Sequence, residues 1–113
     1  MLSSYKIRFV PSARNDLVRM KRYILSEFKY TQYGISFDKK IKDASKRIKV
    51  LPMGYGKTGF TYRGLEIYMR CIHSYIFFYV VDENLISILR VLKEKMNWEY
   101  IISRWLMCDD MCV

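Results

Sequence analysis

Apolar and charged side chains alternate near the start of the chain. Over residues 5–10, Tyr5, Ile7 and Phe9 are separated by basic residues. A period of two is typical of a strand with one buried face. Because proline cannot donate to a strand ladder, we expect the strand to end at Pro11 and a helix to begin there.

Two longer segments then place apolar residues three or four positions apart, which is the spacing of one helix face. These residues are Ala13, Leu17, Met20, Ile24 and Phe28 in the first segment, and Phe37, Ile41, Ala44, Ile48 and Leu51 in the second. Basic residues lie between them, so both helices should have a basic outer face. Thr31 and Gly34 indicate a short turn, and Pro52 ends the second helix. The pattern predicts an antiparallel helical hairpin.

The period changes again in the second half of the chain. Residues 53–59 hold three glycines and are expected to form a loop. This loop lacks the first glycine of a phosphate-binding P-loop, so we expect no nucleotide there. Strands are predicted over residues 65–72, 75–81 and 85–92, joined by two short turns. The middle strand is apolar on both faces and should lie in the centre of the sheet.

A last helix is expected over residues 97–105, with Trp98 and Trp105 on one side. Residues 106–113 should form a C-terminal tail. The order strand, helix, helix, three strands and a short helix predicts a single α+β domain over residues 1–105. In this domain the helical hairpin packs on a mostly antiparallel four-stranded sheet.

Charge narrows the class of partner. The chain has 20 lysines and arginines against 11 acidic residues, which gives a formal net charge of +9. A field of this sign favours polyanions such as nucleic acid, or an acidic protein segment. No apolar run is long enough to cross a membrane and no signal peptide is recognised, so we expect a cytoplasmic protein with no membrane partner.

The cysteines give no clear chemistry. Cys71, Cys108 and Cys112 are odd in number, and reduced thiols are expected in a cytoplasm. With one histidine, His73, in the whole chain, these residues make a poor zinc site. We therefore expect no metal, no cofactor and no small-molecule substrate, and the role of the cysteines stays open.

Several short segments match one known family in their order and spacing. They are Phe9-Val10-Pro11-Ser12-Ala13, Asp16-Leu17, Tyr23-Ile24, Leu51-Pro52, the run from Tyr75 to Asp82, and the run from Ile88 to Trp98. From about Tyr5 to Trp105 the chain thus resembles the RelE/ParE superfamily of bacterial toxins. The resemblance implies a β-α-α-β-β-β(-α) fold and the toxin component of a type II toxin–antitoxin system, as in plasmid stabilisation.

The closest match is to the ParE-like branch, whose members inhibit DNA gyrase and are not nucleases. It lies in the run from Arg90 to Trp98, so the resemblance implies target contacts by Arg90, Lys93, Lys95 and Trp98. Many members have histidine and arginine where this chain has Lys93 and Lys95, so this chain departs from the pattern of the branch at two of the four positions. Trp98 could equally cap the core.

The alternative is a RelE-like ribosome-dependent mRNA endoribonuclease, which needs no metal because the substrate's own 2′-hydroxyl is the nucleophile. Such an enzyme requires an acid, a base and cations at the phosphate. The candidate catalytic residues are Arg70, Arg90, Lys93, Glu94, Lys95 and Tyr100. His73 could transfer a proton or simply form a turn. Because Ile67, Met69 and Ile76 are apolar where these nucleases carry basic residues, we favour the ParE-like reading and leave enzymatic activity open.

A toxin of this family must be neutralised in its own cell. The resemblance implies a cognate antitoxin whose C-terminal segment wraps the toxin, and the net charge favours an acidic one. A third hypothesis is a basic nucleic-acid-binding module without catalysis. It would use exposed aromatic residues among cations. The candidates are Tyr55, Phe60 and Tyr62 beside Lys57 and Arg63.

Overall fold

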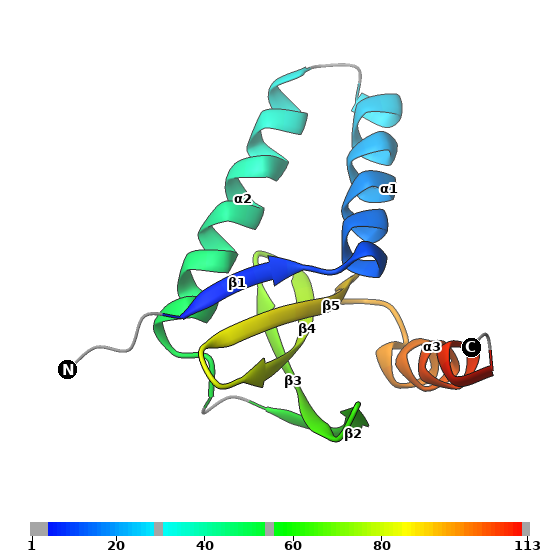
Figure 1. The fold of residues 1–113 in the computed structure, drawn as a ribbon. Coiled ribbons are helices and arrows are strands. Elements are labelled where there is room, and N and C mark those ends of the chain that lie inside the picture. Colours follow the sequence, from blue (N-terminus) through cyan, green and yellow to red (C-terminus); the bar gives the residue numbers. More distant parts are fainter. Residues whose placement is uncertain (1–4, 29–30, 54–55, 112–113) are drawn as a thin grey trace.

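The computed structural model describes residues 5–28, 31–53 and 56–111, with side chains described as far as residue 108. The elements are β1 (Lys6–Phe9), α1 (Pro11–Phe28), α2 (Thr31–Val50), β2 (Lys57–Tyr62), β3 (Leu65–Ile72), β4 (Tyr75–Asp82), β5 (Leu85–Lys93) and α3 (Trp98–Met111). Figure 1 shows α1 and α2 side by side as a hairpin above the sheet. The predicted α+β class and helical hairpin are confirmed.

The sheet has the order β1-β5-β4-β3-β2. β1 runs parallel to β5, and the other neighbours are antiparallel. β4 lies in the centre, as its two apolar faces predicted, and Phe77, Phe78 and Tyr79 are fully buried. The predicted turn at His73-Ser74 joins β3 to β4, with both residues at positive φ.

The prediction of four strands was wrong by one. β2 begins inside the loop that we expected over residues 53–59, and it pairs with β3 through Lys57↔Tyr68 and Thr61↔Glu66. The register shifts between these pairs, and Gly59 adopts a φ of 89° there. Thr58 also donates its hydroxyl to the Ile67 carbonyl oxygen at 2.9 Å. The exposed and half-buried side chains of β2 alternate, but Phe60 and Tyr62 are its only large apolar residues, so the first half of β2 resembles a loop in the sequence.

Two helix boundaries also differ from prediction. Gly34 lies inside α2 rather than in a turn, and a Cβ built on it would lie 3.1 Å from Leu25 Cδ2 on α1. The glycine therefore reflects close packing of the two helices. α3 runs to Met111, beyond the expected end at Trp105, so part of the predicted tail is helical.

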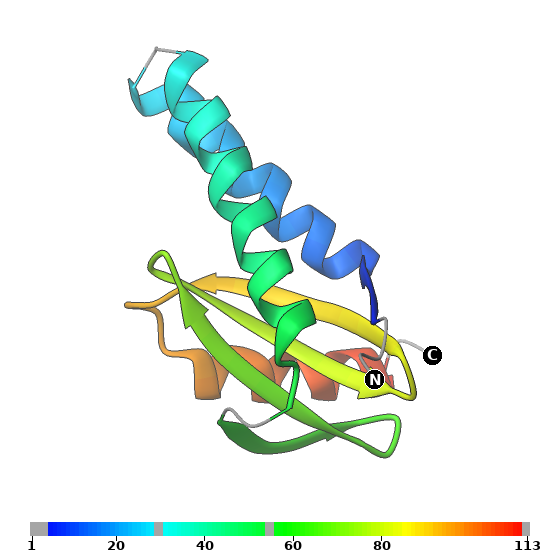
Figure 2. The same ribbon diagram turned by 90° about the vertical axis from the view of Figure 1, so that its left-hand side faces the viewer.

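The sheet separates two apolar clusters, with the hairpin on one face and α3 on the other (Figures 1 and 2). The hairpin-side cluster has buried residues Ala13, Ala44, Ile48, Ile72, Phe77, Tyr79, Ile86, Ile88 and Val91. The α3-side cluster has Ile67, Ile76, Phe78, Val80, Leu89, Leu92 and Ile102. Both faces of the sheet are thus covered by helices.

The hairpin packs on the sheet at one end only. The C-terminal end of α1 and the N-terminal end of α2 project beyond the sheet (Figure 1). Large apolar side chains are exposed there, among them Tyr23 at 52%, Phe28 at 50% and Tyr33 at 42%. Within the described ranges, no helix is both long and apolar enough to traverse a bilayer.

Candidate functional site

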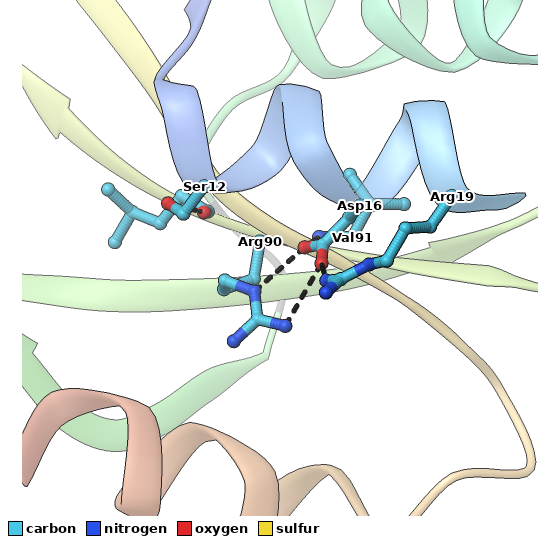
Figure 3. Close-up of polar contacts among 6 residues, drawn as sticks. Ser12, Asp16, Arg19, Arg90 and Val91 are labelled. Atoms are coloured by element: carbon cyan, nitrogen blue, oxygen red, sulfur yellow. Dashed lines mark hydrogen bonds and ion pairs between the residues drawn. The ribbon is translucent and has the colours of Figure 1, made fainter. Parts of the chain in front are cut away.

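A buried carboxylate joins α1 to the end of β5. Asp16 is 3% exposed and receives two hydrogen bonds from Arg90, from Nε at 2.7 Å and from Nη2 at 3.0 Å (Figure 3). The backbone N–H of Val91 donates to the same carboxylate at 2.9 Å, and Arg19 donates from the solvent side at 2.7 Å. Four donors therefore satisfy one buried acid, as a buried charge requires.

The local sequence explains why this acid is needed. β1 ends opposite Ile88, whereas β5 continues to Lys93, so the last part of β5 lacks a neighbouring strand on that side. Side chains from α1 form hydrogen bonds with the β5 backbone groups that a neighbouring strand would otherwise bind. Ser12 donates its hydroxyl to the Leu89 carbonyl at 2.7 Å, and Asp16 accepts from Val91. The start of α1 thus replaces the missing strand and fixes the direction of β5.

Beyond this junction β5 enters a cleft rich in hydrogen-bond donors. Its volume is about 270 Å³, and it is lined by Lys40, His73, Ser74, Tyr75, Lys93, Glu94 and Lys95. We call it the lysine cleft. It brings three predicted site residues together, namely Lys93, Glu94 and Lys95. Lys40 on α2 was not predicted, because the sequence gives no sign that it meets a segment more than fifty residues away.

An apolar groove adjoins the lysine cleft. One cavity of about 510 Å³ lies between α1, the end of β5 and α3, and includes Met20, Tyr23, Met96 and Ile101. A second, of about 310 Å³, lies between α1 and α2 and is lined by Tyr23, Ile24, Phe28, Tyr33, Ser36, Phe37, Lys40, Tyr75 and Lys93. We call the two together the α1 groove, since Tyr23 and Lys93 line both. Lys93 Nζ lies 4.6 Å from the centroid of the Tyr23 ring.

A second carboxylate joins α2 to the β3–β4 turn at the protein surface. Asp43 accepts from His73 Nε2 at 2.8 Å and pairs with Arg47 Nε at 2.9 Å. Arg70 Nη1 donates to the Arg47 carbonyl oxygen at 2.9 Å. The hydrogen bond from His73, with the nearby Arg47 charge in support, holds the pKa of Asp43 below its usual value. Arg70 and His73 therefore contact α2, and Arg70 does not line the lysine cleft.

The remaining predicted site residues lie on α3 or face it. Trp98 packs against Phe78, with ring centroids 5.6 Å apart, and against Phe60 at 6.5 Å. It caps the α3-side cluster, one of the two roles considered for it. Tyr100 is 58% exposed and accepts a hydrogen bond from Arg104 at 3.4 Å.

Two further expectations concern thiols and metals. The Cys71 thiol donates to Glu94 Oε2 at 3.7 Å, and burial, followed by the Glu94 charge, raises the pKa of Cys71. Cys108 is exposed, and Cys112 lies outside the described residues. Over the described part of the chain, no three His, Cys, Asp or Glu side chains come close enough to hold a metal ion.

The aromatic residues proposed for a nucleic-acid-binding module are largely occupied by α3. Tyr62 stacks on Trp105 with centroids 5.6 Å apart, and Phe60 meets Trp98 edge-on. Arg63 lies over the Tyr62 ring. Tyr55 lies outside the described residues. Other exposed aromatic side chains, among them Tyr23 and Phe28, lie in the α1 groove.

Comparison with known proteins identifies the family. A family model described as the ParE toxin of the type II toxin–antitoxin system parDE matches residues 7–98. Among solved structures, the chromosomal ParDE toxin–antitoxin system from P. aeruginosa matches with a TM-score of 0.63 at 15% identity, over 80% of this chain and 96% of that one. This likeness supports the fold. No curated protein sequence matches the chain.

Two further solved structures match with lower TM-scores. The toxin–antitoxin complex RelBE2 from Mycobacterium tuberculosis has a TM-score of 0.43 at 25% identity, over 80% of this chain and 99% of that one. The YoeB dimer from Staphylococcus aureus has a TM-score of 0.45 at 26% identity, over 80% of this chain and 97% of that one.

Proposed function

The chain belongs to the ParE toxin family of type II toxin–antitoxin systems, and from this premise we propose that it inhibits DNA gyrase and is neutralised by an acidic antitoxin segment. The proposal requires that the toxin act in the cytoplasm of its bacterial host, where gyrase works. Lys93 and Lys95, at the open end of β5, are its proposed target contacts.

The observation that carries the choice of gyrase over mRNA is that three of the six candidate nuclease residues lie away from the lysine cleft, which holds the other three. Arg90 is paired with Asp16, Arg70 contacts α2, and Tyr100 lies on the exposed side of α3. General acid–base cleavage needs its groups within hydrogen-bond reach of one phosphate. In addition, α3 covers the sheet face on which Ile67 and Ile76 are buried.

The α1 groove supports the proposed antitoxin contact. Its floor is mainly apolar and aromatic, and cations stand at its edges, with Arg19 and Lys93 at one cavity and Lys40 and Lys93 at the other. An amphipathic segment that is apolar on one side and acidic on the other would bury the exposed rings and meet these charges. The same charges would speed its association at low salt.

Purified toxin should be tested for inhibition of gyrase supercoiling and, separately, for cleavage of mRNA on translating ribosomes. The double variant Lys93→Ala with Lys95→Ala should lose most of the inhibition, because two proposed contacts are removed. The control Lys46→Ala with Lys49→Ala removes equal charge from exposed positions of α2 and should inhibit normally. Message cleavage without an effect on gyrase would replace this proposal with the ribonuclease alternative.

The antitoxin contact is tested by co-purification with the product of the neighbouring reading frame. Tyr23→Asp puts a negative charge in the α1 groove and should weaken the complex at least tenfold. Val18→Asp is the matched control, because Val18 is 48% exposed and lines a different cavity beside Lys21 and Lys42. Equal weakening by both variants would count against this groove as the docking site.

A further inference from the structure

We propose that the lysine cleft and the neighbouring aromatic part of the α1 groove bind single-stranded nucleic acid, with a backbone phosphate in the cleft and a base on the exposed tyrosines. This inference goes beyond the proposed function, since it does not depend on which enzyme the toxin inhibits. It rests on the charges in the cleft, its free donors and the adjoining aromatic surface.

The cations of the cleft come from two distant segments and lack acidic partners. Lys40 comes from α2, and Lys93 and Lys95 from the end of β5. Among the residues that the structure describes, no carboxylate lies within 4.0 Å of these three ammonium groups, whereas Asp16, Asp38 and Asp43 are each paired with cations elsewhere. Part of the excess positive charge of the chain is therefore gathered in one concave place.

Among the described residues that line the cleft, the single acid is directed to another partner. Glu94 accepts the hydrogen bond of the Cys71 thiol on β3 rather than pairing with a lysine. Its charge still lies beside the site and opposes an incoming anion. Removing the Glu94 charge should therefore strengthen the binding of a phosphate, which gives a direct test of the site.

Hydroxyl groups add further donors. Ser74 and Tyr75 line the cleft, and no hydrogen bond from either hydroxyl is found within the described ranges. A tyrosine hydroxyl is protonated at neutral pH and can donate, and burial raises the pKa of Tyr75 further. Ammonium and hydroxyl groups around one cavity suit the non-bridging oxygens of a phosphate, for which lysine is a common ligand in proteins.

The aromatic rings distinguish a nucleic acid from other polyanions. Lys40, Tyr75 and Lys93 line both the cleft and the cavity that holds Tyr23 and Tyr33. Lys93 lies over one side of the Tyr23 ring and the Tyr33 ring packs on Phe28, yet both tyrosines stay more than 40% exposed. A cationic channel beside exposed aromatic rings is the usual arrangement for single strands, whose unpaired bases stack on the rings. A duplex keeps its bases stacked on each other and cannot use them.

The test is fluorescence anisotropy of purified toxin with a short labelled single strand, as DNA and as RNA, and with the matching DNA duplex. We expect both single strands to bind more tightly than the duplex. The triple variant Lys40→Ala, Lys93→Ala, Lys95→Ala should lower the affinity and reduce the slope of log K against log salt by about two, because each phosphate contact in a single strand contributes about 0.7. The relative affinities for DNA and RNA identify the natural strand.

The matched control removes three exposed lysines from α2 outside the cleft, as Lys39→Ala, Lys46→Ala, Lys49→Ala. It has the same net charge as the cleft variant and should keep the larger salt slope. Equal losses in the two triple variants would overturn the proposal, because binding would then follow net charge alone. Melting curves of both variants show whether each is folded.

Two single variants keep the proposal testable even if the triple variant does not fold. Glu94→Gln should tighten binding severalfold. Tyr33→Leu, which keeps an apolar side chain but removes the ring, should weaken single-strand binding about tenfold. Unchanged binding in both variants, or a duplex bound as tightly as the single strand, would show that the cleft and the tyrosines do not form this site.

Discussion

Asp16 attaches α1 to β5 from inside the protein, whereas Asp43 attaches α2 to the β3–β4 turn at its surface. The Asp16 side chain is 3% exposed and that of its partner Arg90 is 12% exposed. Asp43 is 44% exposed, and its partners His73 and Arg47 are 33% and 53% exposed. Both carboxylates bridge a helix and the sheet, but only the first is withdrawn from water.

The difference in burial changes what each carboxylate does. Water competes with the partners of Asp43, so that junction guides the position of α2 without contributing much free energy. Asp16 leaves an unpaired guanidinium and a buried N–H behind if it is removed, so the fold depends on it. Because α1 and the end of β5 line the α1 groove, the buried junction also fixes the shape of the proposed binding surfaces.

The largest effect should follow from Asp16→Ala. We expect a loss of about 3 kcal/mol in the free energy of unfolding, because Arg90 loses its counter-ion and the Val91 N–H its acceptor. Urea unfolding followed by tryptophan fluorescence measures this. The control Asp38→Ala removes an exposed pair with Lys21 and should change stability little. If both variants lost similar amounts of unfolding free energy, burial would not explain the importance of Asp16.

A double-mutant cycle sharpens the comparison between the two junctions. Asp16→Ala and Arg90→Ala, alone and together, should give a coupling energy of about 2 kcal/mol, because each single variant strands the other charge. The same cycle on Asp43 and Arg47 should give coupling close to zero. A larger coupling energy for Asp43 and Arg47 would mean that the exposed junction contributes more to stability than the buried one.

The attachment of α2 should depend on a buried hydrogen bond more than on Asp43. The Tyr79 hydroxyl donates to the Pro52 carbonyl at 2.8 Å, just beyond the end of α2, and Tyr79 is fully buried. Tyr79→Phe keeps the ring and should cost about 1 kcal/mol of unfolding free energy. Tyr100→Phe removes an exposed hydroxyl and is the control. If Tyr79→Phe has an unchanged urea midpoint of unfolding, apolar packing alone would attach α2 to the sheet.

How much of this architecture the sequence predicted depends on the range of the interaction. The helical stripes and the doubly apolar β4 are local patterns, and the structure confirms them. β2 was missed because its first half, residues 57–59, has no large apolar side chain and is held by pairing with β3 around a bulge. The sequence of a segment does not show which other segment it will pair with.

The site residues show the same limit. Arg90 was considered as a target or phosphate contact because of its place in a motif, but its partner Asp16 lies 74 residues earlier. The one available signal was an acid within an otherwise apolar and basic stretch of α1, next to Leu17 on the apolar stripe. Lys93 and Lys95 do line a cleft together, while Lys40 joins them only through the packing of α2.

The smallest predicted effect is the change in unfolding free energy at low pH that comes from the exposed Asp43 junction. The pKa of Asp43 is lower in the folded protein than its ordinary value of 3.8, mainly because His73 donates a hydrogen bond to it. The charged carboxylate therefore stabilises the fold at pH values above 3.8, and this contribution disappears as the pH falls through the lowered pKa.

Asp43→Asn should remove that dependence. The difference in unfolding free energy between the original protein and the variant should be small at pH values above about 4, and should shrink towards zero below that pH as the carboxylate takes up a proton. Urea unfolding at a series of pH values measures it. A difference that persists in strong acid would mean that Asp43 acts through packing and not through its charge, and the contrast with Asp16 would then rest on burial alone.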